Sequence, residues 1–289
     1  MVYMKGQLTN PHGARIMNTT CTHPTTYRTD MNDAEWEVLA PFINHDPKIG
    51  SPRAVCMRCV MNALFYIDRT GCQWNLLPKD LPNYGTVYYY FRKWTDDGTF
   101  ERMNTALRQM IRQRADRDPE PSLAIIDSQS VKTTDVVDTS GYDGGKKIKG
   151  RKRHILVDTL GLLLLVVVTT ASVQDASSAS SIGPRMQQKF PRLQKILVDG
   201  GYKQQFIDWF LRVYGWLVEV VQHPTRLHHF EVLPKRWIVE RTFGWFNNYR
   251  RLSKDYEYYT TTSESMVYLA SIRLMLKRAA NRRDYKPTN

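Results

Sequence analysis

Apolar residues recur every three or four positions through the first part of the chain, a spacing typical of amphipathic helices. The pattern predicts four short helices, over residues 32–43, 52–71, 87–95 and 100–111. Asn32 and Glu35 form a capping-box pattern at the start of the first helix. Pro52 stands at the first position of the second helix, and Gly71 can close it. We expect a small all-α domain over residues 31–118, preceded by a flexible arm over residues 1–30.

The third predicted helix is both aromatic and basic. Gly85 and Thr86 form its expected cap, three tyrosines follow, and the helix then carries Arg92, Lys93 and Trp94. Four short helices with such a helix third in line suit a helix-turn-helix-like module in which Arg92 and Lys93 contact DNA. The alternative is a plain helical bundle whose tyrosines belong to the core.

The pattern changes at Ser122, where helical spacing gives way to short apolar runs that indicate strands. The predicted elements are strands over 123–126, 151–159 and 161–173, a helix over 176–188, a strand over 195–198, a helix over 206–214, a strand over 216–221, and helices over 236–252 and 263–283. Asp175 is the expected N-cap of the first of these helices. The order predicts an α/β fold, with a mixed five-stranded sheet and flanking helices over residues 119–259.

The last predicted helix is basic and amphipathic. Its apolar residues would pack on the sheet domain, while Arg273, Lys277 and Arg278 point outward. We therefore treat residues 260–289 as a C-terminal basic helix packed on the domain of residues 119–259.

Charge and hydropathy narrow the class of partner. The chain has 41 Lys and Arg against 28 Asp and Glu, a net charge of +13 and a pI near 9.6. This excess favours a polyanionic partner, with nucleic acid ahead of a membrane surface. The longest apolar run, 160–168, is far shorter than the roughly 20 residues of a membrane helix, and residues 1–30 lack a signal-peptide core. We expect a cytoplasmic protein without membrane contact.

Three carboxylates stand in positions that favour metal chemistry. Asp127 is predicted to end the first strand and Asp199 the fourth, and Glu240 lies on the helix after the fifth. An aspartate that ends a strand is commonly a cap or turn residue when it stands alone. Parallel neighbouring strands would bring Asp127 and Asp199 together, and a helix beside them can add Glu240. Such a cluster suits Mg²⁺, which prefers oxygen ligands.

The helix of Glu240 has one broad apolar face, formed by Ile238, Trp245, Phe246, Tyr249 and Leu252. Glu240 lies on the opposite face with arginines on both sides. This face has two interpretations. It is a solvent-exposed surface with i,i+4 ion pairs, or it carries Glu240 as a metal ligand with arginines beside it that bind phosphate.

Four motifs in this order resemble those of the DDE transposases of bacterial insertion sequences, closest to the insertion sequence 5 family within the insertion sequence 4 superfamily. The motifs are Ile125-Ile-Asp127-Ser-Gln-Ser-Val-Lys132, Gly150-Arg-Lys-Arg-His154-Ile-Leu-Val-Asp158, Leu197-Val-Asp199-Gly-Gly-Tyr202, and Val239-Glu240-Arg-Thr-Phe243 with Arg250-Arg-Leu252. The similarity runs from about Asn32 to the tail.

The resemblance implies a ribonuclease-H-like catalytic domain in which Asp127, Asp199 and Glu240 are catalytic and bind two Mg²⁺ ions, with Mn²⁺ as a substitute. It also implies hydrolysis of the DNA strand at each transposon end and joining of the freed 3′-hydroxyl to target DNA. The chain departs from the wider superfamily signature at Leu233 and Asn247, where that signature has Tyr and Lys.

Basic residues cluster beside the predicted site. The stretch 141–154 is rich in glycine and in Lys and Arg, and it connects the first two predicted strands. It would contact DNA phosphates, or else form a solvated, mobile hairpin. The predicted DNA contacts are Lys132, Lys146, Lys147, Lys149, Arg151, Lys152, Arg153, Arg236, Arg241, Arg250 and Arg251, together with Arg92 and Lys93. The histidines His223, His228 and His229 are interpreted as residues of a plain loop.

These observations predict a cut-and-paste DNA transposase that binds the terminal inverted repeats of its element and acts as a homodimer or higher oligomer on double-stranded DNA. Two alternatives stay open from the sequence. One is a domesticated metal-dependent endonuclease without strand transfer, and the other is a DNA-binding regulator that has lost the chemistry.

Overall fold

The structure of the chain is a computed structural model, and it describes residues 26–43, 55–186, 189–202, 204–221 and 237–280. The calls for a flexible arm over residues 1–30 and for a helix start at Pro52 therefore fall wholly or largely outside the described residues.

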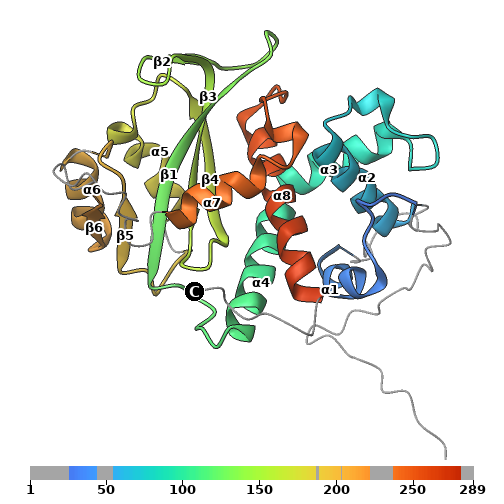
Figure 1. Ribbon diagram of the computed structural model, residues 1–289, viewed down its shortest axis with the longest axis horizontal. Helices are drawn as coiled ribbons and strands as arrows, with labels where there is room; N and C mark the ends of the chain where they lie inside the picture. The colour runs from blue at the N-terminus through green and yellow to red at the C-terminus, as the bar shows by residue number, and fades with distance from the viewer. Residues whose placement is uncertain (1–25, 44–54, 187–188, 203, 222–236, 281–289) are drawn as a thin grey trace, which may run out of the picture.

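A mixed sheet forms one half of the molecule (Figure 1). Its strands are β1 (Leu123–Lys132), β2 (Gly141–Asp143), β3 (Ile148–Val157), β4 (Leu163–Thr170), β5 (Lys195–Val198) and β6 (Leu217–Val220). β3 pairs antiparallel with β1, β2 and β4, whereas β5 runs parallel to β1 and to β6. The predicted mixed α/β sheet is confirmed. It has six strands rather than five, because Gly141–Asp143 adds a short strand to β3.

The N-terminal helices form the other half of the molecule. They are α1 (Asp33–Ile43), α2 (Met57–Thr70), α3 (Tyr84–Asp96) and α4 (Thr99–Arg114), with the 3₁₀ turn η1 (Trp74–Leu76) between α2 and α3. The capping box of α1 is confirmed, since the Glu35 N–H donates to Asn32 Oδ1 at 2.9 Å and the Asn32 N–H donates to Glu35 Oε2 at 3.0 Å. Gly71 ends α2 with a left-handed φ of 72°. Asn83, and not the predicted Gly85 and Thr86, caps α3 by accepting from the Gly85 N–H.

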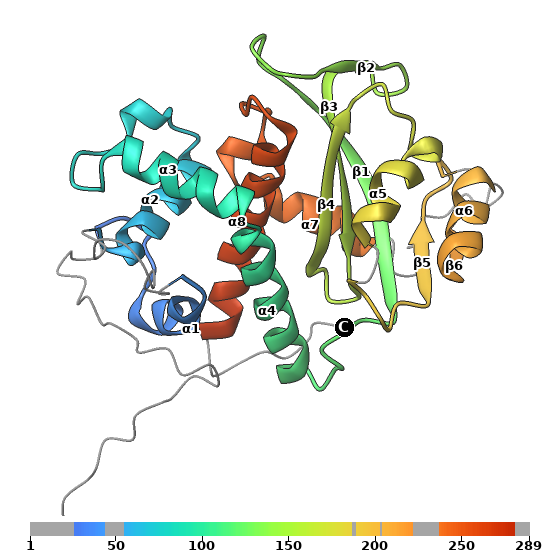
Figure 2. The same ribbon diagram turned by 180° about the vertical axis from the view of Figure 1, so that it is seen from behind.

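The remaining helices cover the two faces of the sheet. α7 (Trp237–Phe246), η3 (Arg250–Leu252) and α8 (Thr260–Ala280) lie on the face that looks toward the N-terminal helices, and η2 (Asp175–Ser177), α5 (Ala179–Met186) and α6 (Gln204–Tyr214) lie on the other (Figures 1 and 2). One apolar cluster runs from α1–α4 through α7 and α8 to Ile125 and Leu197 of the sheet. A second fills the space between the other face and α5 and α6.

The helix α8 lies at the centre of the molecule rather than on the outside of the sheet. It packs against α4, α1 and α2 as well as β4. Arg273 was predicted to point outward, but it is buried and pairs with Glu35 of α1, with an Nη1–Oε2 distance of 2.8 Å. The position of α8 therefore joins the N-terminal helices and the sheet through one core.

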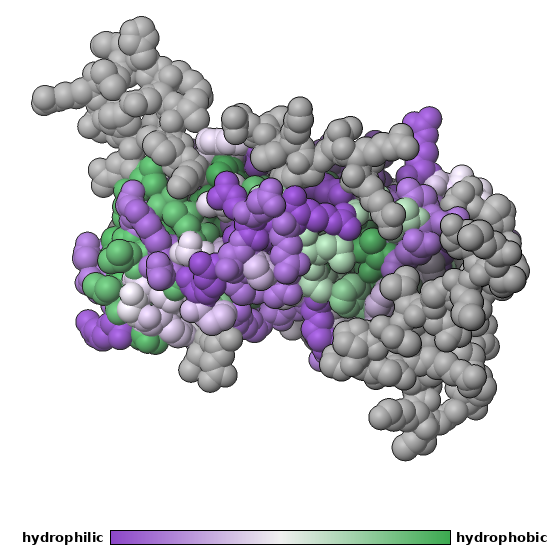
Figure 3. Space-filling model, turned by 90° about the horizontal axis from the view of Figure 1, so that it is seen from below, coloured by the Kyte–Doolittle hydropathy of each residue, from purple (hydrophilic) through white to green (hydrophobic). Residues whose placement is uncertain are grey.

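No helix within the described ranges is long and apolar enough to cross a membrane. Figure 3 views the molecule from below, the end away from the β2–β3 hairpin, and hydrophilic residues cover the middle of that face.

Candidate active site

Asp127 and Asp199 come from neighbouring parallel strands. The last paired residues of β1 and β5 are Ile125 and Leu197, and the same register continued by two residues sets Asp127 beside Asp199. Strands so paired lie about 4.8 Å apart. Since side chains two residues apart share a face of the sheet, both aspartates belong to the face of Ile125 and Leu197, on which α7 packs.

The sequence predicted that Asp127 ends its strand, but it does not. β1 continues to Lys132 because β3 pairs with it over its whole second half, from Asp127 opposite Ile155 to Lys132 opposite Gly150. Asp199 does follow directly after β5, as predicted. The first aspartate is therefore held by hydrogen-bonded neighbours along its backbone, whereas the second stands at the start of a turn.

Backbone donors contact both carboxylates. The Ser128 N–H donates to Asp127 Oδ1 at 2.7 Å, and the Gly201 N–H donates to Asp199 Oδ1 at 3.0 Å. The two side chains thus keep fixed orientations as anionic oxygen donors.

Glu240 lies on the first turn of α7, which contacts β1 and β3. Its neighbours Ile238 and Val239 are buried in the core, while Glu240 itself is exposed. Over the part of the chain that the structure describes, no three His, Cys, Asp or Glu side chains lie close enough together to hold a metal ion. The register of the sheet brings Asp127 and Asp199 together, and Glu240 lies on the helix that packs against the sheet.

Tyr202 follows Asp199 and packs in the apolar cluster on the α5 and α6 face of the sheet. Its side chain is buried, and within the described residues its hydroxyl has no hydrogen-bond partner. Burial raises the pKa of Tyr202 well above its usual value, and the charges of Asp175, Asp127 and Asp199 raise it further. The phenol therefore remains a protonated donor near three carboxylates. The sequence contained Tyr202 only as part of a motif and gave it no role.

Asp175 has a different place from the predicted one. Gln174 occupies the N-cap position of η2, and Asp175 is the first residue of that turn. Its carboxylate instead accepts from Ser128 Oγ at 2.8 Å and lies 3.5 Å from Lys152 Nζ. The prediction of a helix cap is wrong, because the side chain contacts Ser128 of β1 and Lys152 of β3 instead of the N–H groups of a helix.

His154 on β3 is enclosed by this polar cluster. Its Nε2 lies 3.2 Å from Thr169 Oγ1 and its Nδ1 lies 4.0 Å from Asp175 Oδ1. Burial lowers the pKa of His154 to about 4; Asp175 opposes this shift, and Lys152 and Lys146 add to it. The ring is therefore neutral at physiological pH.

This buried histidine predicts a pH-dependent stability. Its pKa in the folded state is below the ordinary value of 6.5, so the unfolded chain takes up the proton first as the pH falls. We expect up to about 3 kcal/mol of unfolding free energy to be lost between pH 6.5 and pH 4. Urea unfolding across this range measures the loss, and His154→Gln should show a flatter profile. Equal pH profiles for the two proteins would contradict this assignment.

Four of the predicted DNA contacts are buried. Arg151 lies 2.5 Å from Asp138 and 3.3 Å from Asp255, and Arg153 donates to the Leu252 carbonyl at 2.7 Å. Arg251 pairs with Glu257 at 2.6 Å, and Lys152 lies between Asp143 and Asp175. These side chains are 0–6% exposed. These four side chains pair with groups of the protein rather than facing solvent, because Arg151, Lys152 and Arg153 lie on β3 rather than in a loop and Arg251 lies on η3.

Gly150 shows the same point. A Cβ at this position would lie 2.0 Å from the Val131 carbonyl oxygen. The glycine permits a close approach between the backbones of β3 and β1.

Other predicted contacts remain at the surface. Lys132, Lys146, Lys147 and Lys149 are exposed around the β2–β3 hairpin, and Arg250 and Lys93 are exposed elsewhere. Lys146 Nζ donates to the Ser128 carbonyl at 2.9 Å. Arg92 is partly buried, and its guanidinium lies 5.0 Å from the Tyr259 ring centre.

Arg241 is held by α7 itself. Its guanidinium lies 4.4 Å from the Trp237 ring centre and 4.7 Å from that of Trp245. Arg236, Leu233, His223, His228 and His229 lie outside the described residues. Asn247 is exposed just after the end of α7.

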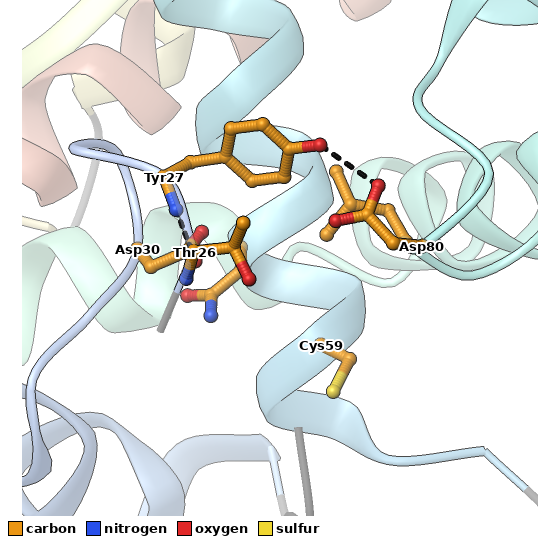
Figure 4. A pocket seen from close by; sticks show the side chains of 7 residues that line it. Thr26, Tyr27, Asp30, Cys59 and Asp80 are labelled. Atoms are coloured by element: carbon orange, nitrogen blue, oxygen red, sulfur yellow. Dashed lines mark hydrogen bonds between the residues drawn. The ribbon is translucent and has the colours of Figure 1, made fainter. Parts of the chain in front are cut away.

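A separate small pocket lies among the N-terminal helices (Figure 4). Its volume is about 120 Å³, and it is lined by Thr26, Tyr27, Asp30, Cys59, Asn62, Asp80 and Leu81. Tyr27 donates to Asp80 across it at 2.8 Å. None of the three predicted catalytic carboxylates lines this pocket.

Comparisons with known proteins bear on both halves of the chain. Residues 118–275 match a family model described as "Transposase DDE domain", and residues 31–104 match one described as "Putative transposase of IS4/5 family". A curated relative from Burkholderia cepacia, the "Putative transposase for insertion sequence element IS402", is 33% identical over 116 residues. That match covers 37% of this chain and 54% of the relative, so the chain spans about half the length of this relative.

Among solved structures, the "Crystal structure of the Mos1 mariner paired end complex with Mn" is 12% identical. The match covers 81% of this chain and 80% of that one, with a TM-score of 0.29. At that score the likeness carries no weight for either fold or function.

Proposed function

The chain belongs to the DDE transposases of the IS4/5 type, and from this premise we propose that it cleaves DNA at the ends of an insertion sequence and joins the freed 3′-hydroxyl ends to target DNA. The observation that carries the proposal is the β1–β5 register, which continues to Asp127 beside Asp199 under the helix of Glu240. The strand order of the sheet is that of a ribonuclease-H-like domain, in agreement with the family.

The carboxylates fit a divalent metal. Asp127 and Asp199 offer anionic oxygens, the donors that Mg²⁺ and Mn²⁺ accept, and backbone N–H groups orient both side chains. We infer that Asp127, Asp199 and Glu240 hold two Mg²⁺ ions, for which Mn²⁺ can substitute. When bound, the ions supply charge stabilisation and an activated nucleophile for phosphodiester cleavage.

The protein's own residues would orient the reactants. Asp127 is fixed in two ways: β3 pairs with its backbone, and the N–H of the next residue of β1, Ser128, donates to its carboxylate. A rigid mount of this kind favours an in-line arrangement of nucleophile and leaving group, which is a large part of catalysis when no covalent enzyme intermediate forms.

The exposed basic residues give the expected path of the DNA. In both ribbon views the β2–β3 hairpin stands at the top of the sheet half, and α3 lies in the upper part of the helical half (Figures 1 and 2). Lys132, Lys146, Lys147 and Lys149 stand around the hairpin and Lys93 stands on α3. We infer that these surfaces bind the terminal inverted repeats. Two DNA ends would require a homodimer or a higher oligomer, acting on nucleoid DNA in the cytoplasm.

An assay with the element's own ends tests the function. The full chain is incubated with Mg²⁺, linear DNA that carries the two ends and a supercoiled target plasmid. Cleavage at the ends followed by joined products supports the transposase. Cleavage without joining would indicate an endonuclease, and binding without cleavage would indicate a regulator. Light scattering of the DNA complex measures the number of subunits.

The hairpin lysines predict a specific change in salt dependence. Lys147→Ala and Lys149→Ala should each weaken binding of end DNA and lower the slope of log K against log salt by about 0.9, since each removes one phosphate contact. Titrations at several salt concentrations measure the slope. Lys195→Ala, at the opposite end of β5 from Asp199, is the matched control and should keep the wild-type slope. A wild-type slope in both hairpin variants would remove the hairpin from the interface.

A further inference from the structure

Asp175 is connected to Asp127 through one residue of β1. Ser128 Oγ donates to Asp175 Oδ1 at 2.8 Å, and the Ser128 N–H donates to Asp127 Oδ1 at 2.7 Å. Successive side chains of a strand point to opposite faces, so Ser128 reaches Asp175 on the face away from Asp127. The position of Ser128 therefore depends on Asp175, and the orientation of the Asp127 carboxylate depends on Ser128.

Asp175 also lies near Asp199. Gly201 stands between the two carboxylates: a Cβ at this glycine would lie 3.1 Å from Asp199 Oδ1 and 3.5 Å from Asp175 Oδ2. The Gly201 N–H already donates to Asp199. The turn after β5 thus packs directly against Asp175, and the position of Asp199 depends on that contact.

Contacts with Ser128 and Lys152 fix the position of the Asp175 carboxylate. Lys152 Nζ lies 3.5 Å from its Oδ1, and Lys152 is itself buried and also pairs with Asp143 at 3.3 Å. The buried Tyr202 hydroxyl, without a partner among the described residues, lies within electrostatic range of Asp175, Asp127 and Asp199. A residue that only caps a helix would not need the contact with Lys152 or the nearby Tyr202.

We propose that Asp175 is a positioning residue of the active site: through Ser128 and the Gly201 turn it sets where the Asp127 and Asp199 carboxylates stand, and hence how tightly they take a divalent cation. This inference rests on the proposed function, because it assumes that the two aspartates bind metal.

Binding of Mn²⁺ to the full chain without DNA tests the proposal, since it does not depend on turnover. Free Mn²⁺ is measured by electron paramagnetic resonance during titration of wild type, Asp175→Ala, Ser128→Ala and the double variant. Loss of a group that orients metal ligands typically weakens affinity by about tenfold or more, and we expect this for both single variants. The double variant should bind no more weakly than Asp175→Ala, because both changes remove the same link.

Glu264→Gln is the matched control. Glu264 is a buried carboxylate paired with Arg185 at 2.8 Å, so its loss should lower stability without changing Mn²⁺ affinity. Ser128→Ala removes a single hydroxyl and keeps the test decisive if Asp175→Ala does not fold.

Asp127→Asn separates the two proposals. If it loses Mn²⁺ while Asp175→Ala and Ser128→Ala bind as wild type, the positioning role is overturned and the proposed function stands. If effects of the single variants multiply in the double variant, the link through Ser128 is overturned. If Asp127→Asn itself binds Mn²⁺ as wild type, the metal site of the proposed function fails as well.

Discussion

Asp127→Asn and Asp199→Asn should each lower Mg²⁺-dependent cleavage of end DNA by on the order of a thousandfold or more, since each removes one anionic ligand from a two-metal site. Asn keeps the size of the side chain and an oxygen acceptor for the backbone donors at Ser128 and Gly201. The loss would therefore come from charge rather than from packing. Single-turnover cleavage rates with labelled ends measure it.

Glu240→Gln extends the same test to the third carboxylate. Because Glu240 is exposed on α7, the substitution should leave the fold and its unfolding free energy unchanged, while cleavage falls to a similar extent. Binding of end DNA should persist in all three variants, and this serves as the control for folding. A variant that cleaves at the wild-type rate would remove its residue from the catalytic set.

The sequence was sufficient where local signals were strong. β5 was predicted at its observed bounds, because Lys195–Val198 is a short apolar run that stops at an aspartate. Its parallel register with β1, continued by two residues, sets Asp199 beside Asp127, although β1 itself runs on past Asp127 to Lys132.

The second half of β1 was missed for a physical reason. The run from Asp127 to Ser130 is polar at every position, so it lacks the alternation of apolar and polar residues that indicates a strand and resembles a loop. In the structure the backbone of this half of β1 pairs with β3, while Ser130 Oγ donates to Asp143 of β2 at 2.6 Å and Ser128 Oγ donates to Asp175 of η2 at 2.8 Å. Pairing between distant segments, which no local pattern reports, decided the outcome.

The same lack of a local signal explains why some arginines were predicted at the surface but are buried. Arg151 and Arg273 look like surface residues by composition, because charged side chains are seldom buried unless they are paired. Their partners, Asp255 and Glu35, are distant in the sequence and become neighbours only when β1, β3 and α8 are assembled. Asp175 was likewise assigned from its immediate neighbours, whereas its contacts come from β1 and β3.

Arg151→Met should lower the free energy of unfolding by about 3–5 kcal/mol, the usual cost of leaving a buried charge without its partner. Arg151 is fully buried, and it contacts Asp138, Asp255 and the carbonyl oxygens of Thr139, Glu257 and Tyr258. Asp255 is 1% exposed, so water cannot replace the lost guanidinium.

The surface pair of Arg192 and Asp118 provides the control for this substitution. Its N–O distance of 2.5 Å equals that of Arg151 to Asp138, but its side chains are 50% and 46% exposed. Arg192→Met should therefore cost no more than about 1 kcal/mol. Urea unfolding of both variants measures the difference. If Arg151→Met proved as stable as wild type but bound DNA with a lower salt slope, the buried-network role would be wrong and the residue would return to the DNA interface, because a phosphate contact affects binding whereas a structural ion pair affects folding.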